Sequence, residues 1–475
     1  MEFKGERADG MEEVYDEPVS PTGQYFNSSV LSICILAALE SDIPIDTSQT
    51  NFLLNTLFIP INPRFSSIMV KDEHGVKQWK KVDVKLEDHV HVPIFPDGLS
   101  PESYDDYLQE YLSKIAMERL PQSRPLWEIH LIKYPTSNAA GTIVFKLHHA
   151  LGDGFSLMGA LFSCLRRADN PSLPLTFPSS KQGKSSDSNR DSFFKKVTGF
   201  LSRFLYTTSD FAWSILKSSF VEDDRTPIRS GHEWVELRPI NISTVTFSLD
   251  QIKQIKDKLG GTINDVITGI IFYGTRLYMQ ISGPQDSINA HSTALVLLNT
   301  RVINNYLSLK EMSKPDSKSP WGNQFGFLHV SIPDLSADVE MANPIDFVYK
   351  GREIIQRKRG SLAVYLTGRL LEMMRKLRGP ETTAQYVHRT LKNSSMTISN
   401  MIGPMEQMSL ADHPARGMYF MVVGVPQSLT ITMVSYMGKL KVAVGVEKDF
   451  INEKLYISCL EKAFTRIFKA AVVSP

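Results

Sequence analysis

Two adjacent histidines, His148 and His149, open the stretch HHALGDG at residues 148–154, which continues to Asp153 and Gly154. An imidazole is the natural general base near neutral pH. The stretch follows TIVFKL (142–147), whose β-rich composition predicts a strand. Because neighbouring side chains on a strand point to opposite faces, one imidazole can enter a site while the other packs behind it. The spacing therefore predicts a histidine base at a strand end.

Two other interpretations of these histidines compete with a base. His148 and His149 point apart, and no further ligands with zinc spacing lie nearby, so a metal site is not expected. Both histidines could instead be structural, one buried and hydrogen-bonded and the other solvated. At average residue usage, however, this arrangement should arise by chance in roughly one in a thousand chains of this length. The rarity of this arrangement favours a catalytic role over a structural one.

The rest of the stretch suggests supporting roles. Asp153 could fix the loop by pairing with an arginine or with backbone N–H groups, without taking part in proton transfer. Gly154 removes a side chain where substrate or backbone comes close. No G-x-S-x-G segment is present, and Cys34, Cys164 and Cys459 lie in no activating context. We therefore expect the nucleophile to be a hydroxyl or amine of the substrate.

HHALGDG also matches the HHxxxDG signature of the CoA-dependent acyltransferase superfamily. The DFGWG segment of the plant alcohol acyltransferases of the BAHD type is missing, and WGNQFGF (321–327) stands in the C-terminal half instead. From about residue 15 to the end, the chain resembles the plant-type bifunctional wax ester synthase/diacylglycerol acyltransferase family. Four segments carry this resemblance: PVSPTGQYF (18–26), RPLWEIHLI (124–132), TINDVITG (262–269) and SNMIGPMEQ (399–407).

The resemblance implies an acyl-CoA-dependent O-acyltransferase that esterifies long-chain fatty alcohols to wax esters and, as a second acceptor, diacylglycerol to triacylglycerol. It makes His149 the base, with His148, Asp153 and Gly154 in support. Acyl-CoA would be the donor substrate, and no permanently bound cofactor, metal or nucleic acid is expected. Two alternatives stay open: a soluble acyltransferase for small specialised alcohols or amines, and a catalytically silent lipid-binding protein.

Other segments supply candidates for binding and for charge stabilisation. Asn264 stands at a predicted helix start, where dipole and donors favour an oxyanion, although it could simply cap the helix. Arg301, in LNTR, fits either a pair with Asp153 or a contact to CoA phosphate. The PLW and SNMIGP segments could equally be structural turns. The candidate substrate- or CoA-binding residues are Pro125, Leu126, Trp127, Asp265, Arg301, Ser399, Asn400, Gly403 and Pro404.

The elements that must position these residues predict an α/β (α+β) fold. By the resemblance it consists of two chloramphenicol-acetyltransferase-like halves, each a mixed β-sheet with helices, joined by a crossover linker. We expect a disordered lead-in at 1–15, an N-terminal domain with the histidines at 16–168, and a C-terminal domain at 221–475. The Ser- and Pro-rich segment 169–192 would be the linker, because it cannot form a packed core.

Hydrophobic spacing predicts the individual elements. Helical spacing is present at 28–41, 155–167, 261–280, 345–358, 361–391 and 450–471, with Thr262 and Asp265 as a capping box. A strand followed by a helix is predicted over 243–260. Further strands are predicted at 293–298, 324–332, 395–400, 417–425, 428–437 and 439–447, the last two joined by a turn near Gly438.

Composition limits the compartment and the partners. The 475 residues are 42% hydrophobic and 22% charged with a net charge of +1, which gives no global attraction for nucleic acid. Three dispersed cysteines fit a reducing compartment, and the polar, acidic N-terminus is unlike a signal peptide.

The amphipathic segment 193–220 fits either an interfacial helix or a helix docked on its own protein. Because the substrates are oily, we expect a peripheral protein on the cytosolic face of the endoplasmic reticulum membrane, with the plasma membrane as the alternative.

Overall fold

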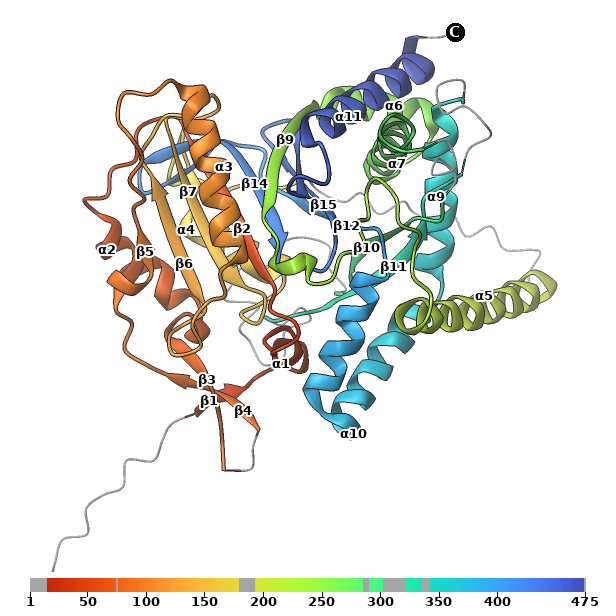
Figure 1. Ribbon diagram of the computed structural model, residues 1–475, viewed down its shortest axis with the longest axis horizontal. Helices are drawn as coiled ribbons and strands as arrows, with labels where there is room; N and C mark the ends of the chain where they lie inside the picture. Colours follow the sequence, from red (N-terminus) through yellow and green to blue (C-terminus); the bar gives the residue numbers. More distant parts are fainter. Residues whose placement is uncertain are drawn as a thin grey trace, which may run out of the picture.

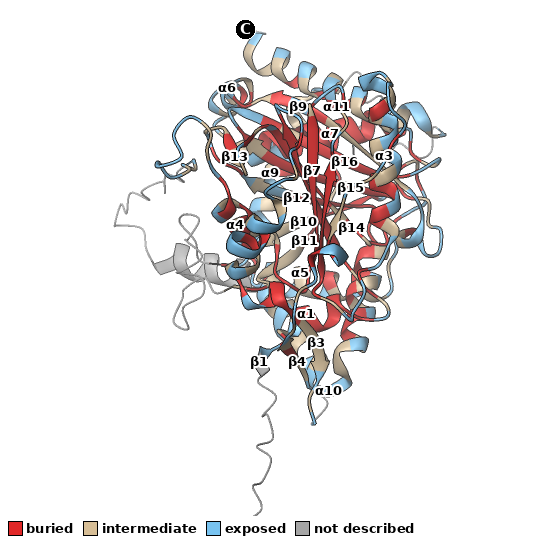
Figure 2. Cartoon of the chain, turned by 90° about the vertical axis from the view of Figure 1, so that its left-hand side faces the viewer, coloured by how far each residue is buried: buried red, intermediate tan, exposed pale blue. Residues whose placement is uncertain are grey.

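A computed structural model describes residues 15–73, 76–178, 193–284, 290–301, 321–334 and 342–473. Two lobes lie side by side, each built on a β-sheet with helices packed on it (Figure 1). The strands run through the middle of the molecule as its most buried elements, and the exposed residues lie mainly on the helices and loops outside (Figure 2). The mixed α/β architecture predicted from the sequence is confirmed.

The first sheet unites strands from distant parts of the chain. Among the described residues it has seven strands, in the order β5-β6-β7-β2-β14-β13-β8. Two of them, β13 and β14, belong to the segment 221–475, which was assigned from sequence to the C-terminal domain. That segment therefore contributes two strands to the sheet of the first lobe. The strands are β5 (Val90–His91), β6 (Trp127–Ile132), β7 (Gly141–His148), β2 (Cys34–Ser41), β14 (His413–Val423), β13 (Met408–Leu410) and β8 (Arg166–Arg167).

Strand β2 corrects one prediction from sequence. The segment 28–41 has helical spacing, but Cys34–Ser41 is a strand whose residues are all buried. It lies between β7 and β14, with Cys34 opposite His148 on one side and Val423 on the other. A strand covered on both faces has no polar alternation, so its apolar run is easily taken for a buried helix.

The second sheet lies in the other lobe. Its order among the described residues is β11-β10-β12-β15-β16-β9. The predicted turn between β15 and β16 is confirmed, with positive φ at Met437 and Gly438 as a tight hairpin requires. The strands are β11 (Phe325–Ser331), β10 (Thr293–Asn299), β12 (Met396–Ile402), β15 (Leu429–Tyr436), β16 (Lys439–Glu447) and β9 (Ile240–Ser248). A small sheet holds β1 (Tyr15–Pro18), β4 (Lys77–Lys81) and β3 (Ser67–Lys71).

The helices predicted beyond residue 150 match the structure to within a few residues, whereas the helix Pro101–Met117 was not predicted. The predicted capping box of α7 is present: the Thr262 side chain accepts the Asp265 N–H, and the Asp265 carboxylate accepts the Thr262 N–H. Helix α10 is broken at Gly379, with φ 84° before Pro380, into the two arms visible in Figure 1. The helices are α1 (Pro21–Phe26), α2 (Thr50–Leu53), α3 (Pro101–Met117), α4 (Gly154–Cys164), α5 (Phe193–Ser219), α6 (Leu249–Leu259), α7 (Ile263–Ser282), α9 (Ile345–Gly360), α10 (Ala363–Lys392) and α11 (Glu453–Phe468).

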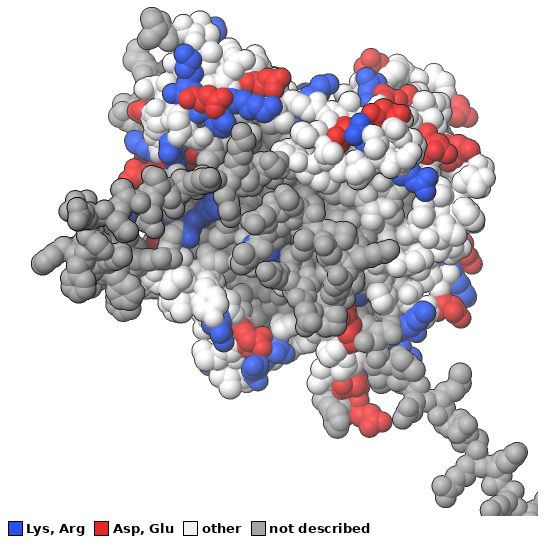
Figure 3. All heavy atoms as spheres, turned by 180° about the vertical axis from the view of Figure 1, so that it is seen from behind, with Lys and Arg blue, Asp and Glu red and all other residues white. Residues whose placement is uncertain are grey.

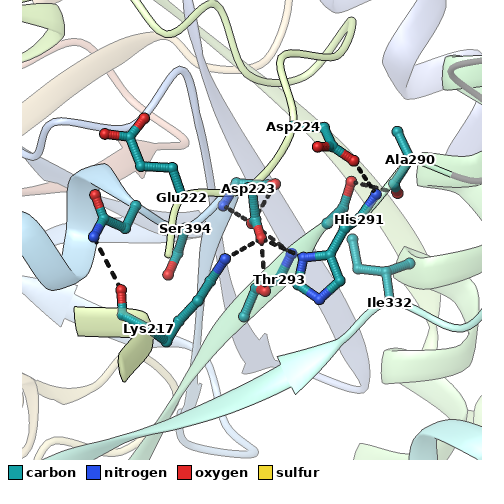
Figure 4. Close-up of polar contacts among 12 residues, drawn as sticks. Lys217, Glu222, Asp223, Asp224, Ala290, His291, Thr293, Ile332 and Ser394 are labelled. Carbon is teal, nitrogen blue, oxygen red and sulfur yellow. Dashed lines mark hydrogen bonds and ion pairs between the residues drawn. The ribbon is translucent and has the colours of Figure 1, made fainter. Parts of the chain in front are cut away.

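The C-terminal end of α5 is fixed to the second sheet by a buried carboxylate, Asp223 (Figure 4). Asp223 pairs with Lys217 and accepts hydrogen bonds from the Thr293 N–H at 2.7 Å, the Ser395 N–H at 2.8 Å and His291 Nδ1 at 2.9 Å. Burial by itself would raise the pKa of Asp223, but these contacts hold it below the ordinary value. Lys217 therefore faces the protein interior, so this end of α5 docks on its own protein.

The surface carries both signs of charge. Lys and Arg side chains are interspersed with Asp and Glu over both lobes on the face shown in Figure 3. Within the described ranges, no helix is long and apolar enough to cross a membrane.

Candidate active site

The HHALGDG stretch connects β7 to α4 and is held by backbone bonds at its start. The His148 N–H donates to the Leu126 carbonyl at 3.0 Å, and the His149 N–H donates to the Ile33 carbonyl at 2.9 Å. The neighbouring Trp127 is fully buried and donates its Nε1–H to the Phe65 carbonyl at 2.8 Å. The PLW segment, Pro125 to Trp127, thus supports the loop from behind.

His148 is a buried neutral imidazole. Its Nδ1 accepts the Ala150 N–H at 3.1 Å, so the proton lies on Nε2, 3.2 Å from Ser32 Oγ. Burial, together with the nearby Lys146 ammonium group, lowers the pKa of His148 to about 3. The side chain has no exposed surface, so it stays behind the loop as its place on the strand predicts.

His149 points the other way, and its tautomer is set by Asn323. The Asn323 amide Nδ2 donates to the His149 carbonyl at 2.9 Å, so its Oδ1 must accept the proton of His149 Nδ1 at 2.7 Å. Nε2 therefore keeps its lone pair. The rings of Phe26 and Phe325 flank the imidazole, with centroids 4.9 and 5.3 Å away. Burial lowers the pKa of His149, opposed by Asp153 and by the Asn323 bond, so the ring is neutral near pH 7.

Asp153 anchors the loop and caps α4. Its Oδ1 accepts the Ser156 N–H at 3.0 Å, and its Oδ2 pairs with Arg301 and accepts the Gln324 N–H at 2.8 Å. Of the two roles considered for Arg301, the structure shows the pair with Asp153. Both side chains are almost wholly buried, with 0% of Arg301 and 6% of Asp153 exposed. The carboxylate thus fixes the loop and does not touch His149 Nδ1.

The segment 321–324 closes over the loop from the other lobe. Arg301 Nη2 also donates to the Gly322 carbonyl at 2.6 Å, and Trp321 Nε1 donates to the Leu151 carbonyl at 2.7 Å. Asn323, the partner of His149, belongs to this segment and was not predicted. In the sequence, WGNQFGF is notable only because it stands where the DFGWG segment is missing. No local pattern indicates that residue 323 lies beside residue 149.

Asn264 and Asn400 lie together at the surface. Asn400 Nδ2 donates to Asn264 Oδ1 at 2.7 Å, so the ND and SN segments meet at the start of α7 and on β12. Asp265 instead faces inward, accepting the Thr262 N–H at 2.8 Å, with Arg352 Nε 3.9 Å away. Asp265 is thereby occupied as a helix cap.

Gly154 lies beside Met401, the residue that follows Asn400 on β12. A Cβ at Gly154 would lie 3.4 Å from Met401 Sδ, which is ordinary contact. Gly403 is needed for a different reason, since a Cβ there would overlap the carbonyl oxygen of Ser435. The Pro404 carbonyl accepts the Met437 N–H at 3.3 Å, and Ser399 is buried on β12. Gly403 and Pro404 therefore shape a turn against β15.

Apolar cavities lie on both sides of the loop. One, of about 270 Å³, is lined by Leu54, Leu57, Phe58 and Phe145 of the first lobe, with others. Phe58 and Phe145 also line a smaller cavity that reaches Gly154 and Met401. A third, of about 250 Å³, lies in the second lobe behind Phe26 and Phe325.

The described residues of this site include no set of metal ligands. Within the ranges that the structure describes, no group of three or more His, Cys, Asp or Glu side chains could hold a metal ion.

Comparisons with known proteins give the family. Residues 60–267 match the model of the wax ester synthase/diacylglycerol acyltransferase catalytic domain, and residues 321–468 match the WS/DGAT C-terminal domain. Wax ester synthase/diacylglycerol acyltransferase 4 of Arabidopsis thaliana is 31% identical over 98% of this chain and 92% of its own. The chain belongs to the wax ester synthase/diacylglycerol acyltransferase family. It is therefore an acyltransferase, and the recognition made from its motifs is confirmed.

Other members and solved structures agree. Wax ester synthase/diacylglycerol acyltransferase 11 of Arabidopsis thaliana is 30% identical, covering 97% of this chain and 96% of its own. The wax ester synthase/diacylglycerol acyltransferase from Marinobacter aquaeolei VT8 shares the fold with a TM-score of 0.58 at 16% identity, covering 95% of this chain and 98% of its own. The starter condensation domain of rhizomide synthetase, solved in complex with C8-CoA and Leu-SNAC, shares it with a TM-score of 0.52 at 10% identity, over 97% and 94%. The two-lobed acyltransferase fold is thus confirmed.

Proposed function

We propose that this family member transfers the acyl group of acyl-CoA to the hydroxyl of a long-chain fatty alcohol, giving a wax ester and free CoA, with diacylglycerol as a second acceptor. One observation carries the proposal: His149 is a buried, neutral imidazole whose Nδ1 proton is held by Asn323, which leaves Nε2 as a base. A general base oriented in this way suits direct transfer to a hydroxyl.

In the proposed reaction, His149 Nε2 takes the hydroxyl proton as the alcohol oxygen bonds to the thioester carbonyl carbon. The tetrahedral intermediate then expels the CoA sulfur, which receives the proton back from the imidazolium. The oxyanion would be held by backbone N–H groups or by Asn264 Nδ2, since Asn264 Oδ1 already accepts from Asn400. His148, Asp153 and Gly154 would keep His149 and the loop in place.

The donor and the acceptor are supported by the cavities and by a relative. The apolar cavities beside Gly154 and behind Phe325 suit hydrocarbon chains. A structural neighbour was solved with C8-CoA, which supports acyl-CoA as the donor. For the remaining candidates, the contacts described above support positioning roles. These candidates are Pro125, Leu126, Trp127, Asp265, Arg301, Ser399, Gly403 and Pro404.

We also propose a peripheral position on the cytosolic face of the endoplasmic reticulum membrane, where such acceptors dissolve. Exposed apolar side chains on α10, including Met373 (53% exposed) and Leu377 (77%), support contact with a membrane surface. The side chains of 193–205, in the first half of the predicted interfacial helix, lie outside the described residues. Fractionation of expressing cells tests this: we expect the protein in the microsomal pellet and its release by alkaline carbonate.

The test of function is acyl transfer by purified protein with radiolabelled acyl-CoA and a long-chain alcohol. We expect His149→Ala to reduce kcat by about a hundredfold or more. His91→Ala is the matched control, because His91 lies on β5, an edge strand of the first sheet. A normal rate for His149→Ala would refute the mechanism.

A panel of acceptors separates the proposal from its alternatives. Activity confined to short or aromatic alcohols or amines would favour an acyltransferase of specialised metabolites. Tight acyl-CoA binding without transfer to any acceptor would favour a catalytically silent lipid-binding protein. We expect esters of long-chain alcohols, and triacylglycerol when diacylglycerol is supplied.

A further inference from the structure

The cavity behind Phe26 and Phe325 contains a histidine that the proposed reaction does not use. This cavity, of about 250 Å³, lies between β11 and α10 and is called here the His329 cavity. Phe26 and Phe325 line it and also contact the ring of His149. A chain bound in the cavity would therefore extend away from the reacting atoms.

His329 lies along the wall of this cavity at a distance from His149. Phe325, Phe327 and His329 alternate along β11 and so share one face of the sheet, and all three line the cavity. Phe325 and His329 are four residues apart on an extended strand, which corresponds to a separation of roughly 13 Å. A group at His329 would thus meet the middle of a long chain whose end is at His149.

One nitrogen of His329 is unpaired. Its side chain is buried, with 6% of the residue exposed, and Nδ1 lies 3.4 Å from Ser214 Oγ. Nε2 is buried and has no hydrogen-bond partner among the described residues. An unpaired buried polar atom is destabilising, so a cavity that held only hydrocarbon would be better lined here by an apolar side chain.

The imidazole is also uncharged. Burial, together with the nearby Lys358 and Lys217 ammonium groups, lowers the pKa of His329 to about 3. A neutral ring at physiological pH favours a neutral polar group over a carboxylate. Because Ser214 Oγ can either donate to Nδ1 or accept from it, Nε2 is either an acceptor or a donor. A hydroxyl group can both donate and accept a hydrogen bond, so it can pair with Nε2 in either state.

We propose that the His329 cavity binds a hydrocarbon chain bearing a hydroxyl group partway along its length, with that hydroxyl hydrogen-bonded to His329 Nε2. This inference rests on the proposed function, because the chain belongs to the acyl donor or to the acceptor alcohol. Either source places the same chemistry in the cavity, and the two are distinguished by experiment.

The test uses purified full-length protein and sets of equally long chains in which one hydroxyl is moved stepwise along the chain. In one arm the acceptor alcohol is hydroxylated and the acyl-CoA is plain; in the other the acyl-CoA is hydroxylated and the alcohol is plain. Only esters of the terminal hydroxyl are counted, after separation by mass. We expect a maximum of kcat/KM at one mid-chain position, about tenfold above the plain chain, in one arm.

Variants assign the maximum to His329. His329→Leu should abolish the roughly tenfold preference, whereas His329→Gln, which keeps a hydrogen-bonding side chain, should retain part of it. The matched control is Thr390→Val, because Thr390 lines the same cavity but its hydroxyl already donates to the Tyr386 carbonyl at 2.9 Å. Its hydroxyl-position profile should remain that of the wild type.

Contrary outcomes separate the two proposals. Wild-type protein that esterifies plain chains with a flat profile in both arms, or a maximum that survives His329→Leu, would overturn this inference and leave the proposed function intact. Wild-type protein that acylates no alcohol, plain or hydroxylated, would overturn the proposed function itself. Should His329→Leu not fold, as judged by its thermal unfolding, the wild-type profile and His329→Gln still decide the question.

Discussion

The proposed base, His149, is oriented by an amide. Asn323 holds the Nδ1 proton of His149, a task that a carboxylate performs in the Ser-His-Asp triads. The nearby carboxylate, Asp153, is instead paired with Arg301. A neutral partner fixes the tautomer without stabilising the imidazolium by a full charge, so in the proposed reaction His149 stays unprotonated until it takes the acceptor's proton.

Substitution of Asn323 tests this division of tasks. We expect Asn323→Leu to reduce kcat by about ten- to a hundredfold, because Nδ1 loses its acceptor and either tautomer becomes accessible. Asn323→Asp keeps an acceptor but adds a charge, so it should raise the pKa of His149 and move the acid limb of the kcat/KM profile to higher pH. Equal losses in both variants with an unchanged profile would indicate a purely structural residue.

The wild-type pH–rate profile follows from the lowered pKa of His149, for which burial is the main cause. The proposed base works unprotonated, so the rate should fall only when the pH drops below its pKa. We expect kcat/KM to be level from about pH 8 down to about pH 6.5, the ordinary value for histidine, with the acid limb below that. An acid limb centred above pH 7 would contradict the neutral environment described for His149.

At the scale of the elements, the Asp153–Arg301 pair joins α4 to the end of β10. We expect Arg301→Leu to lower the free energy of unfolding by about 3–5 kcal/mol, since it leaves Asp153 buried without its partner. Adding Asp153→Asn should recover part of this loss, because the amide still accepts the Ser156 N–H at the helix cap. Chemical denaturation of the single and double variants measures the coupling, and additive losses would show that the two side chains act independently.

Two glycines near the loop differ in what they tolerate. Gly403→Ala should lower the free energy of unfolding by about 1–3 kcal/mol, because its Cβ would overlap the backbone of Ser435. Gly154→Ala should change it by less than about 0.5 kcal/mol, since the new methyl group meets Met401 at ordinary contact distance. Thermal unfolding of both compares them; equal destabilisation would contradict the close approach at Gly403. Gly154→Ala should still slow transfer, as it narrows the cavity beside the loop.

Local signals predicted local structure well. The Thr262–Asp265 box marks the start of α7, the turn at Gly438 joins β15 to β16, and HHALGDG marks the end of β7, directly before His149. Contacts between distant segments could not be predicted from one chain. Asn323 lies 174 residues from His149, and β2 was taken for a helix because both of its faces are buried.

At the scale of the whole molecule, buried neutral histidines make stability depend on pH. Burial lowers the pKa values of His130, His148 and His329 to about 3 from the ordinary 6.5. Above pH 6.5 neither state is protonated, and stability is complete. Below pH 6.5 these histidines are protonated in the unfolded chain but stay neutral in the folded protein. The free energy of unfolding therefore falls as the pH drops towards 3, by up to roughly 4 kcal/mol per pH unit for the three histidines together.

Urea denaturation at pH 7.5 and pH 5.5 measures this dependence. His329→Leu should reduce the slope, because one of the buried neutral histidines is removed. Equal free energies of unfolding for the wild type at the two pH values would show that these histidines bind protons as readily in the folded protein as in the unfolded chain.

The place of β14 in the first sheet has a consequence for how the enzyme is made. During synthesis, residues 34–148 leave the ribosome long before Val423, so β2 waits with one edge unpaired. The histidine loop can therefore acquire its final support only when nearly the whole chain has been translated. A shortened chain ending at the linker would keep every residue of HHALGDG and still present an open, apolar sheet edge, which makes aggregation its expected fate.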